Sequence, residues 1–223
     1  MKLALLSDIH SNRQALDACM SHARAQGAER FAWLGDLVGY GADPGYVVRQ
    51  AMALVAAGHC VIGGNHDALA VHPPKPGDRA ASTVAAYGAQ WTHEQLTPQE
   101  RAFLAARPLV AEIGGVLLAH ASADTPERWP YLDNETAAAQ CLDAATRRPG
   151  ICHVFCGHVH QQTLYQRGTW RGLVCFTPQP GVAPSGAATA AVGGDHRLGR
   201  PAARRRPACH VCPARHRCLV AAL

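Results

Sequence analysis

The 223-residue chain lacks any long apolar run, and none of its apolar stretches approaches the roughly 20 residues that a helix needs to cross a bilayer. It also lacks a signal-peptide pattern, because one Lys precedes a very short apolar run that leads directly into Asp8 and His10. The sequence therefore predicts a cytoplasmic protein without a membrane partner, long enough for one full-sized domain and its core.

A secreted disulfide framework is absent as well. The nine cysteines are odd in number and scattered along the chain, so we expect reduced thiols.

An excess of positive charge is absent outside the C-terminal tail, although the net charge is +5. Seven of the 21 Lys and Arg residues, but only one of the 16 Asp and Glu residues, lie from Pro184 onward. A basic excess can indicate a nucleic-acid partner. Because the excess is confined to the tail, we do not expect nucleic acid to bind the rest of the chain.

The N-terminal stretch from Leu3 to His10 is a short apolar run that ends in Asp-x-His. It predicts a buried strand. Because side chains two apart in a strand point to the same side, Asp8 and His10 can reach one point beyond the strand's carboxyl end, where α/β sheets usually bind ligands. For this stretch alone, a buried strand with an incidental polar end explains the pattern equally well.

Helical and strand patterns alternate in the next part of the chain. Residues 12–26 have apolar or small residues at helical spacing, and Gly27 is suited to end that helix. Further patterns predict a strand at 31–34, a helix at 44–57 and a strand at 60–62. This alternation predicts an α/β fold with a parallel sheet. All three strands end in polar residues that can bind metal.

The second half of the chain predicts a helical insert followed by further strands. The expected elements are helices at 79–95 and from Thr97, a hairpin of strands 109–113 and 116–119, a helix at 134–145, and strands at 151–156, 163–166 and 173–176. Specificity is expected to reside in the loops and in the insert, which could cover the mouth of a site.

The residues that end the strands share the ability to bind a metal or move a proton. They are Asp8, His10, Asp36, Asn65, His66, His120, His158 and His160. Carboxylates mixed with imidazoles suit Mn, Fe, Zn, Co or Ni. The set is too large for one ion and fits two ions that share a ligand. Since a carboxylate can bridge two ions and an imidazole cannot, Asp36 is the natural bridge.

Five blocks in this order resemble the full signature of the calcineurin-like metallophosphoesterases. The blocks are Asp8-Ile9-His10, Gly35-Asp36, Gly64-Asn65-His66-Asp67, His120 and Gly157-His158-Val159-His160. The resemblance extends from residue 1 to about Ala183. It implies a four-layer α/β/β/α sandwich with a dinuclear metal site.

The resemblance also implies a role for each residue. The family pattern gives Asp8, His10 and His160 to one ion, Asn65, His120 and His158 to the other, and Asp36 to both. His66 then acts as a general acid on the leaving oxygen, steadied by Asp67. The implied protein is a phosphodiesterase or phosphatase that acts on a small phosphoester with two divalent ions, Mn first among them, and a bridging hydroxide. The patterns carry no signal for an oligomeric state.

Two positions distinguish branches of that superfamily. Ser/Thr protein phosphatases and symmetric diadenosine tetraphosphatases have Arg shortly after Gly-Asp and Glu after Gly-Asn-His. This chain has Val38-Gly39-Tyr40-Gly41 and Asp67 at these places. It looks more like the small prokaryotic phosphodiesterase branch, and a diadenosine tetraphosphatase or protein phosphatase-like activity is the alternative.

Regular periodicity ends after Ala183. From Pro184 to Leu223 the residues Ala, Gly, Arg, Pro and Cys dominate, as expected from GC-rich DNA translated in the wrong frame. Reading from the second base of the Arg197 codon permits a Gly-rich turn and a strand, which resembles the segment that this branch carries there. We therefore predict a metallophosphoesterase domain at 1–183 and a disordered, out-of-frame basic tail at 184–223, with the last strands of the second sheet missing.

The tail supports one competing interpretation. Cys209, His210, Cys212, His216 and Cys218 have the spacing of a compact zinc knuckle, and an Arg run precedes them. This pattern is typical of a nucleic-acid-binding module. If the tail is out of frame, the pattern is accidental.

Overall fold

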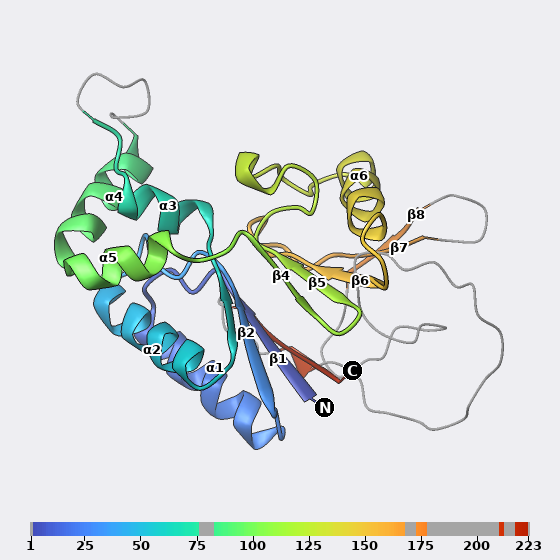
Figure 1. The fold of residues 1–223 in the computed structure, drawn as a ribbon, viewed down its shortest axis with the longest axis horizontal. Coiled ribbons are helices and arrows are strands. Elements are labelled where there is room, and N and C mark those ends of the chain that lie inside the picture. The colour runs from blue at the N-terminus through green and yellow to red at the C-terminus, as the bar shows by residue number, and fades with distance from the viewer. Residues whose placement is uncertain (1, 76–82, 168–172, 178–209, 212–216, 223) are drawn as a thin grey trace.

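The structure is a computed structural model that describes residues 2–75, 83–167, 173–177, 210–211 and 217–222 (Figure 1). The elements are β1 (Lys2–Ser7), α1 (Arg13–Ala25), β2 (Arg30–Leu34), α2 (Pro44–Ala56), β3 (Cys60–Ile62), α3 (Asn65–Val71), α4 (Val84–Gln95), α5 (Pro98–Ala105), β4 (Val110–Ile113), β5 (Val116–Ala119), η1 (Pro126–Arg128), α6 (Glu135–Thr146), β6 (His153–Phe155), β7 (Leu164–Arg167), β8 (Leu173–Phe176), β9 (His210–Val211) and β10 (Arg217–Ala222).

The first sheet has the strand order β3-β2-β1-β10-β9. Strands β1, β2 and β3 are parallel, and α1 and α2 connect them. This part confirms the α/β alternation expected from the sequence. Because the three strands are parallel, their carboxyl ends lie at one edge of the sheet.

Alternate side chains of β1 enter two different apolar clusters, as the pleat of a strand requires. Leu6 packs in the cluster formed with α1 and α2, whereas Leu3 and Leu5 pack against Leu118 of β5. On the second sheet, Leu117 points the other way, into a cluster with α6. The two sheets therefore share one apolar cluster, while the other two clusters join the first sheet to α1 and α2 and the second sheet to α6 (Figure 1).

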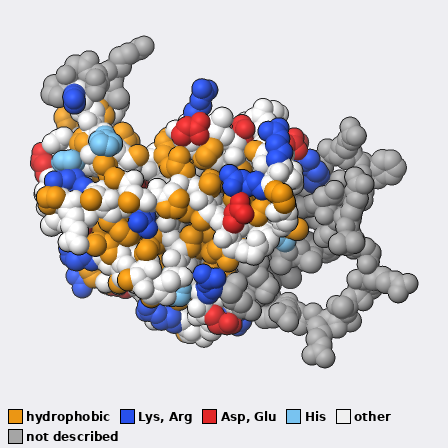
Figure 2. Space-filling model, viewed as in Figure 1, with side chains coloured by type: hydrophobic (Ala, Val, Ile, Leu, Met, Phe, Trp, Pro, Cys, Tyr) orange, Lys and Arg blue, Asp and Glu red, His pale blue; other side chains and the backbone are white. Residues whose placement is uncertain are grey.

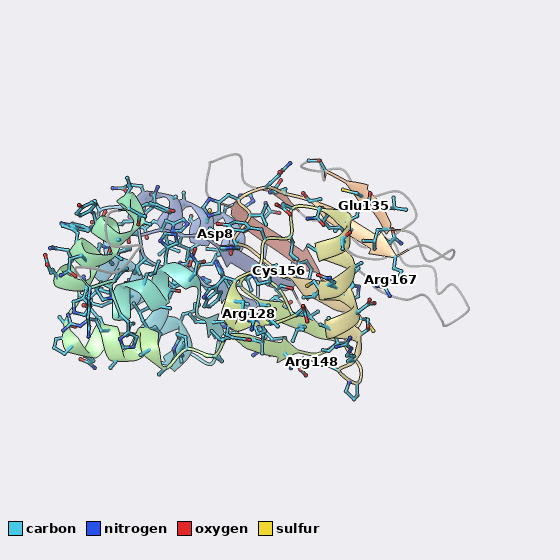
Figure 3. The ribbon with its side chains drawn as sticks, turned by 90° about the horizontal axis from the view of Figure 1, so that it is seen from above. Asp8, Arg128, Glu135, Arg148, Cys156 and Arg167 are labelled. Atoms are coloured by element: carbon cyan, nitrogen blue, oxygen red, sulfur yellow. The ribbon has the colours of Figure 1, made fainter. Side chains whose placement is uncertain are left out.

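The second sheet has the order β4-β5-β6. Its hairpin forms where it was expected, and β6 is parallel to β5, so both strands end at one side. Strands β7 and β8 form a separate antiparallel pair. Arg167 of β7 donates hydrogen bonds to the Ala139 carbonyl and the Asp143 carboxylate, which ties this pair to α6 (Figure 3).

Helices α4 and α5 form the predicted insert beside α2, and α3 packs against both of them. The capping box of α5 is present: Thr97 Oγ1 accepts from the Glu100 amide at 3.2 Å, and Glu100 accepts from the Thr97 amide at 2.8 Å. Two details differ from expectation. Helix α4 begins at Val84, residues 76–82 being outside the described ranges, and α3 forms directly after Gly64, where no helix was predicted.

The described part of the tail departs from the prediction. β10 pairs antiparallel with β1, from Lys2 opposite Ala222 to Ser7 opposite Arg217, and β9 pairs with β10. For these residues the prediction of an irregular tail does not hold. Residues 184–209, 212–216 and 223, which include most of the zinc-like cluster, lie outside the described residues.

Two further expectations concern membrane-spanning segments and the state of the cysteine thiols. Within the described ranges, no helix has both the length and the apolar character needed to cross a membrane. In the same ranges, the thiols of Cys60, Cys141, Cys152, Cys156 and Cys175 are free.

Candidate metal centre

The predicted ligands lie at the carboxyl ends of strands from both sheets. Asp8 and His10 follow β1, Asp36 follows β2, Asn65 begins α3 after β3, His120 follows β5, and His158 and His160 follow β6. Asp8 lies near the middle of the molecule, between the insert and α6 (Figure 3). The edge of each sheet thus contributes to one candidate site, and side chains of both sheets share one apolar cluster.

The structure brings these side chains together in two groups that share one residue. The groups are Asp8, His10, Asp36 and His160, and Asp36, His120 and His158, with ligand atoms within 4.8 Å of one another in each. Asn65 Oδ1 lies 3.1 Å from His120 Nε2 and so adjoins the second group.

Within each group, carboxylate oxygens and imidazole nitrogens lie close to one another. His160 Nε2 lies 3.1 Å from Asp8 Oδ1 and 3.1 Å from His10 Nε2. Asp36 Oδ2 lies 3.2 Å from His120 Nε2 and 3.9 Å from His10 Nε2. Oδ2 of Asp36 is therefore the atom that faces both groups.

The other carboxylate oxygen of Asp36 is held by backbone. Oδ1 accepts from the amide of His66 at 2.8 Å, in the first turn of α3. This bond fixes the carboxylate plane and aims Oδ2 at the imidazoles. It also favours the charged carboxylate, since amides at a helix N-terminus stabilise negative charge.

Backbone carbonyls orient the buried imidazoles. His10 Nδ1 lies 3.1 Å from the Val38 carbonyl, and His120 Nδ1 lies 2.7 Å from the Leu34 carbonyl. A proton on each Nδ1 leaves the Nε2 lone pair facing the centre, the arrangement that metal-binding histidines usually have. Nε2 of His158 is buried and has no hydrogen-bond partner among the described residues. Such an orphaned lone pair fits a metal ion.

The backbone at the ligands is strained. Five of the seven predicted ligands are non-glycine residues with positive φ: Asp8 (54°), His10 (49°), Asp36 (50°), His158 (69°) and His160 (57°). Left-handed conformations are uncommon for such residues and cost about 1–3 kcal/mol each when imposed by the surroundings. Strain of this kind concentrates at functional sites, so it marks these five residues as candidates for one shared site.

Two glycines allow the carboxylates to lie close to the neighbouring loops. A Cβ on Gly64 would lie 2.3 Å from Asp36 Oδ1, and a Cβ on Gly157 would lie 2.6 Å from Asp8 Oδ2. The amide of His158 instead donates to both Asp8 oxygens, at 3.0 and 3.2 Å. The Gly in each motif is therefore required by close approach to an acidic side chain.

The electrostatics of the centre favour bound cations. Burial raises the pKa of Asp8, but hydrogen bonding to His160 and the charge of His120 outweigh it and lower that pKa to about 2. Burial lowers the pKa of His120, yet the hydrogen bond and charge of Asp36 raise it to about 9. Burial lowers the pKa of His10 and of His158. A metal ion would displace the His120 proton and compensate both carboxylates.

His66 and Asp67 lie outside both ligand groups, and their surroundings differ from those of the ligands. The His66 ring belongs to neither ligand group, lies 5.1 Å from the His10 ring, and has its pKa lowered by burial. Asp67 accepts from the amides of Gly64 at 2.9 Å and Val38 at 3.1 Å. Among the described residues no hydrogen bond joins Asp67 to the His66 ring. Burial, followed by the charge of Asp36, raises the pKa of Asp67 to about 7, although the two amide bonds favour its charged form.

Sequence reasoning missed two tyrosines beside the centre. The Tyr40 ring lies 4.7 Å from His10 and the Tyr131 ring lies 4.1 Å from His158. The pattern Gly-Tyr-Gly shortly after Gly-Asp was a usable signal for Tyr40, whereas Tyr131 lies in an irregular segment without one.

Charged side chains on the visible face of the molecule are spread singly or beside opposite charges (Figure 2).

Comparisons with known proteins agree with this site. The family model described as calcineurin-like phosphoesterase superfamily domain matches residues 1–192, which extends past the expected boundary at Ala183. An uncharacterized protein of Methanocaldococcus jannaschii is 34% identical over 138 residues, which are 58% of this chain and 53% of that protein. The chain thus spans about half the length of this curated relative.

Two solved structures share the fold. A metallophosphoesterase from Sphaerobacter thermophilus has a TM-score of 0.67 and 28% identity, over 86% of this chain and 77% of that one. A hypothetical protein from Pyrococcus horikoshii OT3 has a TM-score of 0.60 and 18% identity, over 78% of this chain and 75% of that one. Since the family model spans most of the sequence and every residue of the candidate centre, the chain belongs to the calcineurin-like phosphoesterase superfamily.

Proposed function

We propose that the protein is a metal-dependent phosphodiesterase or phosphatase that hydrolyses small phosphate esters with two divalent ions. The observation that carries this proposal is the position of Asp36. Its Oδ2 faces His10 of one ligand group and His120 of the other, while its Oδ1 is engaged by backbone. A single shared oxygen of this kind suits a bridge between two ions.

The remaining ligands divide between the two ions. Asp8, His10 and His160 would hold one, and Asn65, His120 and His158 would hold the other. Their mixture of oxygen and imidazole donors suits Mn, with Fe, Zn, Co or Ni as other candidates. When bound, the ion pair would supply the positive charge that orients a phosphoryl group and the acidity that activates water.

Two side chains outside the ligand groups, His66 and Asp67, would serve the leaving oxygen and the geometry of the site. His66, outside both ligand groups and half-buried, would donate a proton to the leaving oxygen as the reaction's general acid. Asp67 would act as a positioning residue: its bonds to the Gly64 and Val38 amides join the turn that carries His66 to the loop that carries Asp36.

We also propose that the architecture is the four-layer α/β/β/α sandwich of the superfamily. The three apolar clusters support this arrangement, since they lie between α1 and α2 and the first sheet, between the sheets, and between the second sheet and α6. In such a sandwich, the strand ends that carry the ligands meet at one edge.

The deciding experiment is a screen of p-nitrophenyl phosphate and bis-p-nitrophenyl phosphate against Mn, Fe, Zn, Co and Ni. We expect hydrolysis of at least one ester, and loss of that activity on chelation. Failure to hydrolyse either ester, with metal content verified by mass spectrometry, would contradict the proposal. A salt-sensitive RNA or DNA complex in that preparation would favour the binding-module interpretation.

A further inference from the structure

Two exposed tyrosines border the centre. The side chain of Tyr40, in the loop after β2, is 66% exposed, and that of Tyr131, between η1 and α6, is 59% exposed. A single exposed aromatic residue needs no explanation. These two differ from others because each lies against an imidazole of the site.

The loop of Tyr40 is pressed against the centre. A Cβ on Gly41 would lie 2.3 Å from the His10 carbonyl oxygen, and a Cβ on Gly39 would lie 2.8 Å from His66 Nδ1. Tyr40, between these glycines, has φ of 59°. Its ring lies 4.5 Å from the His66 ring and 4.7 Å from the His10 ring. A strained turn thus holds a large, exposed ring beside the proposed general acid.

Tyr131 lies beside the ligand group of His158, as Tyr40 lies beside the group of His10. Its ring stacks on His158 at 4.1 Å with an angle of 27° between the planes. The backbone of Trp129, which has φ of 53°, hydrogen-bonds to His158 and fixes the segment beside it. His10 and His158 belong to the two ligand groups that share Asp36, so the two tyrosine rings border one centre.

Tyr87 provides a comparison within the chain. Its side chain is 67% exposed on α4, as much as that of Tyr40, but it has no ring contact with another aromatic or imidazole among the described residues. Exposure alone therefore does not place a tyrosine at the site. The shared feature of Tyr40 and Tyr131 is a fixed ring at the metal ligands with most of its surface open to a bound molecule.

Resting on the proposed function, we propose that Tyr40 and Tyr131 form a stacking site for a planar aromatic group of the substrate, which is therefore an aryl phosphate or a nucleotide rather than an alkyl phosphate. Aromatic rings bind one another in stacked or edge-to-face arrangements. Stacking of this type tolerates many ring systems, because every aromatic ring and nucleobase presents a π face.

The test measures binding to the Mn-loaded full chain by calorimetry, with phenylphosphonate and methylphosphonate as probes. Both contain a carbon–phosphorus bond and are not hydrolysed, so the reactivity of the leaving group has no influence. We expect phenylphosphonate to bind about tenfold tighter, within the range measured for aromatic stacking. Tyr40→Ala and Tyr131→Ala should each reduce this ratio severalfold, whereas Tyr40→Phe, Tyr131→Phe and the control Tyr87→Ala should preserve it.

A second pair of probes distinguishes the two sources of the aromatic group. α,β-Methylene-ADP and methylenediphosphonate present related phosphonates with and without a nucleoside. A preference for the nucleotide supports a nucleobase in the stacking site, and a preference confined to phenylphosphonate supports an aryl phosphate.

Two results would overturn the stacking site. One is equal affinity for the aromatic and non-aromatic members of both pairs. The other is an equal loss of phenylphosphonate and methylphosphonate binding in Tyr40→Ala and Tyr131→Ala, which would show that the rings only position the imidazoles. Hydrolysis of the p-nitrophenyl esters tests the proposed function separately, since the binding ratios decide the stacking site whether or not turnover occurs.

Discussion

The two ligand groups differ in the solvent exposure of their histidine side chains. In the first group the side chain of His160 is 49% exposed, whereas in the second the side chain of His120 is 0% exposed. Asp36, which belongs to both, is 2% exposed. One ion would therefore be open on one side and the other enclosed. The enclosed group depends on the packing of both sheets, and the open group leaves room for exchange of ligands and for a substrate.

The largest effect is expected at the residue that joins the two groups. Asp36→Asn should remove both ions and lower kcat/KM by roughly a thousandfold or more, because the variant loses the several kcal/mol of charge stabilisation that bound ions supply. Metal content by mass spectrometry, measured beside kcat/KM, checks this. Retention of two ions in this variant would show that Asp36 Oδ2 is not the bridge.

A residue outside both groups should separate metal binding from turnover. His66→Ala should keep both ions and lower kcat by about a hundred- to ten-thousandfold, the usual contribution of a general acid. His93→Ala is a matched control, since His93 lies on α4 and bonds to the Ala70 carbonyl. Loss of metal from His66→Ala would instead make His66 a ligand.

The contrast in exposure predicts unequal effects on stability. In metal-free protein, His120→Ala should lower the free energy of unfolding by about 2–4 kcal/mol, because it leaves a cavity and an unpaired Asp36 oxygen. His160→Ala should lower it by less than His120→Ala does, because half of the His160 side chain is exposed and the His158 amide still donates to Asp8. Urea unfolding of the two variants measures both values. Equal losses would mean that the two groups do not differ in enclosure.

The location of the centre could be predicted from sequence because it follows from strand direction. Asp8 and Asp36 come directly after apolar runs, and the carboxyl ends of parallel strands share one edge. Helix α3 was missed because Gly63 and Gly64 favour a loop, while its cap is supplied by the Asp67 carboxylate.

Other features depend on contacts that no local pattern contains. The partners of Asp67 are two backbone amides, one of them 29 residues away at Val38, so its side chain could be misjudged as a partner of His66. The use of one Asp36 oxygen for both groups depends on the His66 amide. Tyr131 is placed by stacking on His158, which is distant in sequence.

The smallest effect is expected at the tail, where we retain the proposal of an out-of-frame segment. β10 adds to β1 through backbone hydrogen bonds, which most sequences can form, so this pairing does not require an evolved tail. All proposed ligands precede residue 184, and restoring the frame should leave metal content unchanged. It should raise the melting temperature by a few degrees, given about 2–4 °C for each kcal/mol in a domain of this size. Sequencing the gene between the codons for Val182 and His196 checks the frame. An unshifted frame, together with tail peptides in the native protein, would refute the proposal.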